Sequence, residues 1–153
     1  MVLTLLQGAI FLSYVTFLWI TFKGPIPSIS DSWYLLKGRQ KFLFTLFCFS
    51  LGITMLFQSV PSALFFLSGV ALSFVGINTT FKDDWIIPYV HFAGAGLCIV
   101  FALLGIGFVL NSWIPMIIFV ILAGLIKLLK VKNDVWWIEI AAFLAIIFGL
   151  LIY

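Results

Sequence analysis

Charged residues are scarce in this chain of 153 residues. Only 8% of its residues are Asp, Glu, Lys or Arg, whereas soluble domains average about 25%. Hydrophobic residues make up 65% of the chain. This balance excludes a soluble globular domain, because too few polar side chains remain to cover a surface that faces water. The sequence therefore predicts an integral membrane protein with a single transmembrane domain, residues 1–153.

Side chains that bind metals or form disulfides are few. The chain has one histidine, His91, and two cysteines, Cys48 and Cys98, which both lie inside apolar stretches. Zinc needs three or four converging protein ligands, and these are not available here. We therefore predict no metal and no other cofactor. The two cysteines are expected to be small buried side chains rather than a disulfide.

The apolar residues form six continuous runs. These runs comprise residues 2–22, 42–58, 62–80, 87–110, 114–130 and 135–152. A helix that crosses a bilayer needs roughly 20 apolar residues, and several of these runs approach that length. The strands of an outer-membrane barrel would instead alternate apolar and polar residues. We therefore predict an all-α fold, a polytopic bundle of about six transmembrane helices.

The basic residues gather in two of the connections between these runs. The first connection, residues 23–41 and called loop one below, and the fifth connection contain seven basic residues between them: Lys23, Lys37, Arg39, Lys41, Lys127, Lys130 and Lys132. By the positive-inside rule, the odd-numbered connections face the cytoplasm and both termini are non-cytoplasmic. The net charge is only +3, and basic residues beside apolar runs suit anionic lipid headgroups. We expect membrane lipids as partners and no nucleic acid.

In this topology most reactive side chains lie at the loop-one end of the bundle. Loop one contributes Ser28, Ser30, Asp31, Ser32 and Tyr34; Asp83 and Asp84 follow the third run; His91 and Glu139 occupy the first turns of the fourth and sixth runs. The opposite end is almost purely apolar. A polar binding pocket is therefore expected at the loop-one end.

Glu139 is the only acidic residue placed within an apolar run. An ionisable group at membrane depth is costly and normally has a partner or a function. One interpretation places it at the membrane interface, near water and a helix N-terminus, with Trp136 and Trp137 at the headgroup level. The alternative predicts that its carboxylate lies within hydrogen-bond or one-water reach of His91 or loop one.

His91 also has two interpretations. It is either a structural hydrogen-bonding residue or a group that binds a headgroup or moves a proton, because imidazole changes charge near neutral pH. Magnesium or calcium on the aspartates of loop one and of the third connection is a further alternative. So is a serine nucleophile, Ser28 or Ser30, although no nucleophile-elbow pattern accompanies it.

Small residues recur at helical spacing in the third and fourth runs, at Gly69, Ser73, Gly76, Gly94 and Cys98. Small residues let helix backbones approach closely in lipid. We expect them to pack helices within one chain, with a homo-oligomer interface as the alternative.

Three short motifs extend over most of the chain. Residues 27–34, Pro-Ser-Ile-Ser-Asp-Ser-Trp-Tyr, resemble a P-x-I-S or SIS-x-Y-Y first-loop motif. Residues 91–96, His-Phe-Ala-Gly-Ala-Gly, resemble an H-x-x-G/S-A segment that opens a fourth helix. Residues 138–143 with 148–150 resemble a closing E-x-x-A and F-G segment. In these motifs the chain resembles the DRAM/Frag/Sfk membrane family and its small bacterial relatives.

The resemblance implies a six-helix bundle in which loop one, the fourth-helix histidine and the last-helix glutamate lie together. The eukaryotic members are associated with lipid distribution, GPI-lipid remodelling and autophagy signalling, and the bacterial group has no settled activity. We expect a multi-pass protein of the bacterial inner membrane. A more distant similarity to ceramidase-like transmembrane hydrolases does not extend to their zinc site, which needs several histidines.

The sequence favours a membrane protein that binds or senses a lipid headgroup in a polar pocket at the loop-one end, and it favours binding over catalysis. The candidate ligand-binding residues are Ser28, Ser30, Asp31, Tyr34, Arg39, Asp84, His91 and Glu139. The alternatives are a ceramidase-like membrane hydrolase and a structural or pore-forming oligomer.

Overall fold

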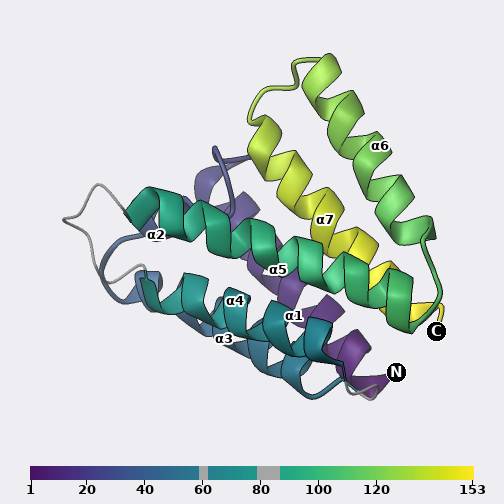
Figure 1. The fold of residues 1–153 in the computed structure, drawn as a ribbon. Coiled ribbons are helices and arrows are strands. Elements are labelled where there is room, and N and C mark those ends of the chain that lie inside the picture. Colours follow the sequence, from purple (N-terminus) through teal and green to yellow (C-terminus); the bar gives the residue numbers. More distant parts are fainter. Residues whose placement is uncertain (59–61, 79–86) are drawn as a thin grey trace.

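The chain is all-α in the residues that the computed structural model describes, 1–58, 62–78 and 87–153 (Figure 1). The long helices are α1 (Val2–Phe22), α3 (Lys41–Leu56), α4 (Ala63–Asn78), α5 (Ile87–Val109), α6 (Ile114–Leu128) and α7 (Asp134–Leu151). Each lies within one of the six predicted runs or differs from it by a residue, so the predicted fold class is confirmed. Loop one also contains a short helix, α2 (Ser32–Leu35), and a 3-10 turn, η1 (Gly38–Gln40), which the sequence pattern does not predict.

The lengths of the helices decide which of them can cross a membrane. Among the described residues, three helices are long and apolar enough to do so: α1, α7 and residues His91–Val109 of α5. The shorter apolar helix α6 has 15 residues, which span about 23 Å at 1.5 Å per residue, less than the roughly 30 Å of a hydrocarbon core. The chain is thus a helical protein with three candidate membrane spans.

The helices pack mainly against their neighbours in the sequence. α3 packs against α4, α4 against α5, and α6 against α7. α1 contacts α3 and α7, and α5 contacts α6 and α7, so α1 and α5 together join the pair α3 and α4 to the pair α6 and α7. Both ends of the chain lie at the same end of the bundle, away from loop one (Figure 1). We call this end the terminal end. Along α6, which is described throughout, only Pro115 is buried; Met116 and Phe119 pack against the core, and most of the other side chains of this helix are exposed.

Aromatic side chains fill the core beneath loop one. Phe11, Phe44 and Trp136 are almost completely buried there. The Tyr14 ring stacks on Phe47 with ring centroids 4.3 Å apart. A second, aliphatic cluster occupies the terminal end. Since apolar side chains gain little by leaving lipid, close packing of this kind is what holds helices together in a membrane.

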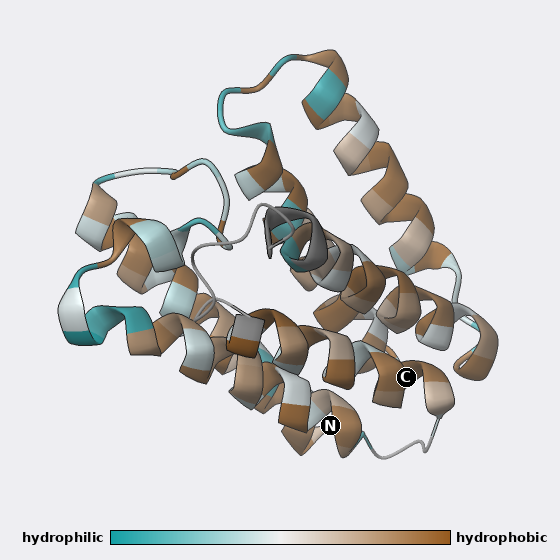
Figure 2. Ribbon diagram, turned by 60° about the vertical axis from the view of Figure 1, so that its left-hand side comes forward, coloured by the Kyte–Doolittle hydropathy of each residue, from teal (hydrophilic) through white to brown (hydrophobic). Residues whose placement is uncertain are grey.

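Hydrophilic residues gather in loop one and in the connection between α6 and α7, and the helices are mostly hydrophobic (Figure 2). The two connections are joined, because the Asn133 side-chain amide donates a 2.7 Å hydrogen bond to the Pro25 carbonyl. The outer helix faces expose large apolar side chains, including Leu12, Phe66 and Phe108. Such a surface suits lipid rather than water.

The predicted small-residue stripe brings α3 and α4 into close contact. A Cβ atom added at Gly69 would lie only 2.6 Å from the Gly52 carbonyl oxygen. One added at Gly76 would lie 2.8 Å from the Cβ of Cys48, and one at Gly94 would lie 2.9 Å from the Val75 side chain. These small residues are therefore used within the chain. The homo-oligomer alternative stays a prediction.

We expect Gly69→Ala to lower the free energy of unfolding by about 1–3 kcal/mol, because the new methyl group meets backbone and α3 must move away from α4. Gly96→Ala is the matched control, since a Cβ at Gly96 meets no atom within 4 Å and alanine favours a helix. Unfolding in detergent, followed by circular dichroism, measures both. Equal stability of the two variants would contradict the close contact.

Candidate functional site

Glu139 holds loop one against α7. Its Oε1 accepts a 2.9 Å hydrogen bond from the Ser30 hydroxyl, and its Oε2 accepts a hydrogen bond from the backbone N–H of Ile29. Both carboxylate oxygens are therefore engaged by adjacent residues of loop one. The prediction that Glu139 lies within hydrogen-bond reach of loop one is confirmed.

Serine side chains give loop one the shape that this contact requires. The Ser28 Oγ accepts a 2.9 Å hydrogen bond from the Asp31 N–H, which closes a tight turn. The Ser32 N–H then bonds to the Ile29 carbonyl at 3.1 Å. The Ser32 and Tyr14 hydroxyls share a 2.7 Å hydrogen bond that fastens the turn to α1. This turn directs the Ile29 N–H and the Ser30 hydroxyl toward α7.

Loop one also caps the start of α7. The first N–H groups of a helix have no partner within the helix. In α7 the backbone N–H of Trp136 has a partner outside the helix, because it donates a 3.2 Å hydrogen bond to the Pro27 carbonyl. Asn133, which precedes the helix in a left-handed conformation with φ of 57°, donates its side-chain amide to Pro25. Glu139 is thus the third of three ties between loop one and this helix end.

A small cavity lies beside the Glu139 carboxylate. Its volume is about 30 Å³. Its wall consists of Ser30, Glu139 and apolar side chains of loop one, α3, α4, α5 and α7, which are Ile29, Phe44, Phe47, Leu72, Val75, Ala95, Cys98, Ile99 and Phe143. A space of this size has room for about one water molecule. A lipid headgroup does not fit here while loop one is in place.

His91 lies apart from this contact. Its side chain is only 5% exposed, and its ring lies 6.0 Å from that of Phe44 and 6.2 Å from that of Phe92. Within the described residues neither ring nitrogen has a hydrogen-bond partner. The alternative in which Glu139 pairs with His91 is therefore not observed. A buried ring nitrogen without a partner is uncommon, so His91 stays a candidate for a hydrogen bond to a water or ligand.

The other predicted site residues are divided between the interior and the surface. Ser28 and Ser30 are buried, and Asp31 is half-buried. Tyr34 and Arg39 are exposed on the outer side of loop one. Asp84 lies outside the described residues. The structure thus joins Ser28 and Ser30 to the Glu139 contact and places Tyr34 and Arg39 on the surface. Ligand binding by these residues stays a prediction.

The carboxylates and thiols do not gather into a metal site. Across residues 1–58, 62–78 and 87–153, no three His, Cys, Asp or Glu side chains come close enough to hold an ion. Cys48 and Cys98 are both buried and free, so the prediction that they form no disulfide is confirmed.

Sequence reasoning missed Gln7. This side chain is only 3% exposed in the second turn of α1, and its amide nitrogen and oxygen have no partner among the described residues. The signal was present in the sequence, because an amide inside an apolar run is costly to bury. The hydrogen bonds from Asn133 and Trp136 to loop one have no comparable signal in the sequence, since they form only between segments that the fold brings together.

No family model, curated protein or solved structure matches the chain. The resemblance to the DRAM/Frag/Sfk family stays a prediction from the motifs at residues 27–34, 91–96 and 138–143. Two of these motifs do meet in the structure, since Ser30 of the first bonds to Glu139 of the last.

Proposed function

We propose that the chain is a six-span membrane protein that binds an anionic lipid at its loop-one end. Three helices have the length of a span, and the shorter ones can be accommodated by local bilayer thinning. An even number of crossings suits chain ends that lie at the same end of the bundle (Figure 1). The motif resemblance implies the same six-helix arrangement.

An apolar groove on the outside of the bundle is the observation that carries the lipid proposal. It runs between α1 and α3 and has a volume of about 480 Å³. Its lining is mostly apolar and comprises Ala9, Ile10, Ser13, Tyr14, Phe17, Leu43, Leu46, Phe47 and Ser50. In a bilayer this open groove faces acyl chains. Its size and lining suit part of one such chain.

Basic and aromatic side chains lie at the loop-one end of this groove. Lys41 begins α3 only two residues before Leu43, which lines the groove. Its ammonium lies 5.6 Å from the centre of the Trp33 ring. Lys37 and Arg39 are exposed just before it. Aromatic rings and basic side chains at this depth favour an anionic headgroup, with about 1 kcal/mol from each basic residue.

The contact at Glu139 supports this site by fixing loop one. Because Ile29 and Ser30 are bonded to the carboxylate, the basic residues that follow are held near the groove before lipid binds. Preorganisation of this kind lowers the entropy cost of binding. In this proposal Ser28 and Ser30 position the loop, and Lys37, Arg39 and Lys41 contact the headgroup.

We expect the triple variant Lys37→Ala, Arg39→Ala, Lys41→Ala to retain at least tenfold less anionic phospholipid, because it removes three headgroup contacts. Lipid that co-purifies with the protein is quantified by mass spectrometry. The control is Lys127→Ala, Lys130→Ala, Lys132→Ala, which removes the same charge from a connection joined to loop one by Asn133. An equal loss of lipid in both triple variants would contradict a specific site.

A second pair of variants tests the groove itself. Ser13→Trp places an indole inside the groove, and Leu12→Trp places one on an exposed neighbouring position that does not line it. Only Ser13→Trp is expected to lower the amount of bound lipid. If both tryptophans have the same effect, the acyl chain lies elsewhere.

A further inference from the structure

Two glutamine side chains lie unpaired away from loop one. Among the residues described, neither the amide nitrogen nor the amide oxygen of Gln7 has a hydrogen-bond partner, and the amide nitrogen of Gln58 has none either. An amide that is buried without hydrogen bonds costs about 1–3 kcal/mol by mutational estimates. Inside a membrane bundle such groups are tolerated where they line a cavity that holds water.

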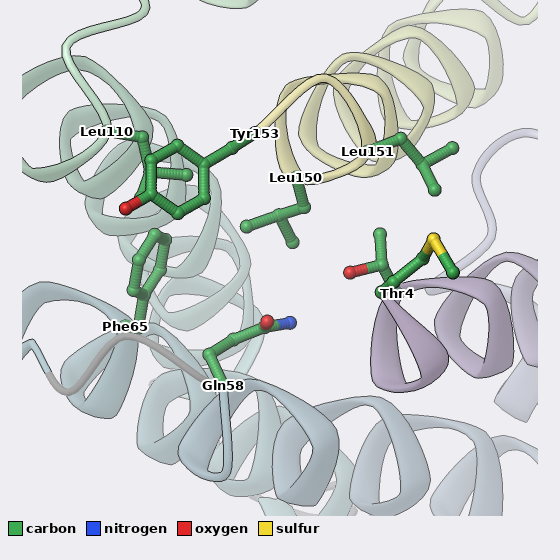
Figure 3. A pocket seen from close by; sticks show the side chains of 8 residues that line it. Thr4, Gln58, Phe65, Leu110, Leu150, Leu151 and Tyr153 are labelled. Carbon is green, nitrogen blue, oxygen red and sulfur yellow. The ribbon is translucent and has the colours of Figure 1, made fainter.

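A pocket at the terminal end has room for such water. It has a volume of about 290 Å³ and is lined by Met1, Thr4, Gln58, Phe65, Leu110, Leu150, Leu151 and Tyr153. The Thr4 hydroxyl and the Gln58 amide point into it from α1 and from the end of α3 (Figure 3). The space is large enough for several water molecules, and these two groups can bind them.

Two smaller cavities lie between Gln7 and Glu139. Gln7 lies one turn of α1 beyond Thr4 and lines a cavity of about 20 Å³. Leu72, Cys98 and Phe143 line this cavity and also line the cavity of about 30 Å³ beside Glu139. Each cavity is large enough for about one water. Polar groups and water-sized spaces thus follow one another from the terminal end to the carboxylate.

We propose that protons cross the bundle along this row, with Glu139 as the group that binds them. A proton that enters from the terminal end moves between waters past Gln7. A hydronium beside Glu139 then transfers its proton to the carboxylate, which leaves a neutral water and a neutral carboxylic acid. The reverse transfer on the loop-one side releases the proton. Acidic residues at membrane depth serve as proton relays in pumps and transporters.

Ser30 suits the relay because its hydroxyl both donates and accepts hydrogen bonds. It donates to the carboxylate in the charged state. Once Glu139 is protonated, its new O–H can be donated to the same Ser30 oxygen, so loop one stays in place. Of the other ionisable groups described, Asp31 of loop one and the Cys48 thiol of α3 lie within electrostatic range of Glu139, and the Cys98 thiol of α5 lines the same cavity. Asp31 is partly exposed, so in this proposal the proton released from Glu139 passes Asp31 on its way to the water outside.

Proton flux into liposomes tests the proposal independently of lipid binding. Purified protein is reconstituted with a pH-sensitive dye inside, and a potassium gradient with valinomycin drives proton entry. Proton flux is expected to be higher with the wild type than in protein-free liposomes. Glu139→Gln is expected to reduce the flux to the protein-free level, and Asp134→Asn on the same helix is expected to keep the wild-type flux. A wild type that matches protein-free liposomes, or a flux that Glu139→Gln leaves unchanged, overturns the proposal.

Gln7→Leu is the second variant, because it removes the interior amide without touching loop one. We expect it to reduce proton flux at least fivefold, while the exposed control Gln40→Leu has wild-type flux. Unchanged flux in Gln7→Leu overturns the path past this residue.

Hydroxyl-radical labelling provides a readout other than flux, since radicals form from waters bound inside a protein. Cys98 lines both small cavities and Cys48 lines neither, although both thiols are buried. Cys98 is expected to be oxidised several times faster than Cys48, and Gln7→Leu to remove most of the difference. Equal oxidation of the two thiols in the wild type overturns the proposal.

Discussion

Glu139→Ala is expected to release loop one from α7 and to lower the free energy of unfolding by about 2–4 kcal/mol. The Ile29 N–H and the Ser30 hydroxyl both lose their acceptor. A hydrogen bond to a charged group contributes about 1.5–3 kcal/mol, and an unsatisfied buried donor has a similar cost. Part of this loss is offset by water that enters beside the partly exposed side chain. Unfolding in mixed detergent micelles measures the change.

Two further variants separate the hydrogen bonds from charge alone. Glu139→Gln keeps one side-chain oxygen as an acceptor, so we expect it to be destabilised about half as much as Glu139→Ala. Asp134→Asn removes an exposed carboxylate that pairs with Lys127 at 2.6 Å, and exposed ion pairs contribute little. If Asp134→Asn were as destabilised as Glu139→Ala, the loss would come from charge and not from loop one.

Trp136→Ala is expected to have the largest effect on stability, about 3–5 kcal/mol. The Trp136 side chain is 0% exposed beneath loop one, among the aromatic residues of the core. Its removal leaves a cavity where loop one, α1 and α7 meet. The backbone N–H that bonds to Pro27 is kept, so the variant isolates the contribution of the indole.

Trp136→Phe should cost much less, because within the described residues the indole nitrogen has no hydrogen-bond partner to lose. Trp19→Ala is the surface control, since Trp19 is 44% exposed and meets Trp137 only edge-on. We expect Trp19→Ala to change stability by less than about 1 kcal/mol. A loss in Trp136→Phe as large as that in Trp136→Ala would contradict this, because it would show that the indole nitrogen and not the ring volume carries the stability.

The helices were largely predictable, because continuous apolar runs end where polar or turn-forming residues begin. The first run, residues 2–22, coincides with α1. The following Lys23 adopts a left-handed conformation with φ of 56°, and its N–H closes the helix end on Trp19. The short segments α2 and η1 were not predicted, since three or four residues are too few to show a helical period.

The candidate site was predictable in part. A glutamate in an apolar run is unusual enough to mark a site from sequence alone. Its partner was not fixed, because His91 and loop one are both expected at the same end of the bundle. The choice follows from the fold: Asn133 and Trp136 attach loop one to the start of α7, and this brings Ile29 and Ser30 to the carboxylate.

The membrane topology is predictable at two levels. The continuous apolar runs predict helices, and three of those described have the length of a span. Orientation depends instead on which connections carry Lys and Arg, since charge on short connections sets the side of the membrane. That the termini are non-cytoplasmic stays a prediction, and a reporter fused to the C-terminus would check it.

Amide hydrogen exchange at Ile29, measured in lipid nanodiscs, tests the contact between Glu139 and loop one most directly. The Ile29 N–H donates to the Glu139 carboxylate, so its exchange should be slow in the wild type and in Asp134→Asn. In Glu139→Ala it should become at least tenfold faster, because the acceptor is gone. If Ile29 exchanges at the same rate in the wild type and in Glu139→Ala, Glu139 does not hold loop one.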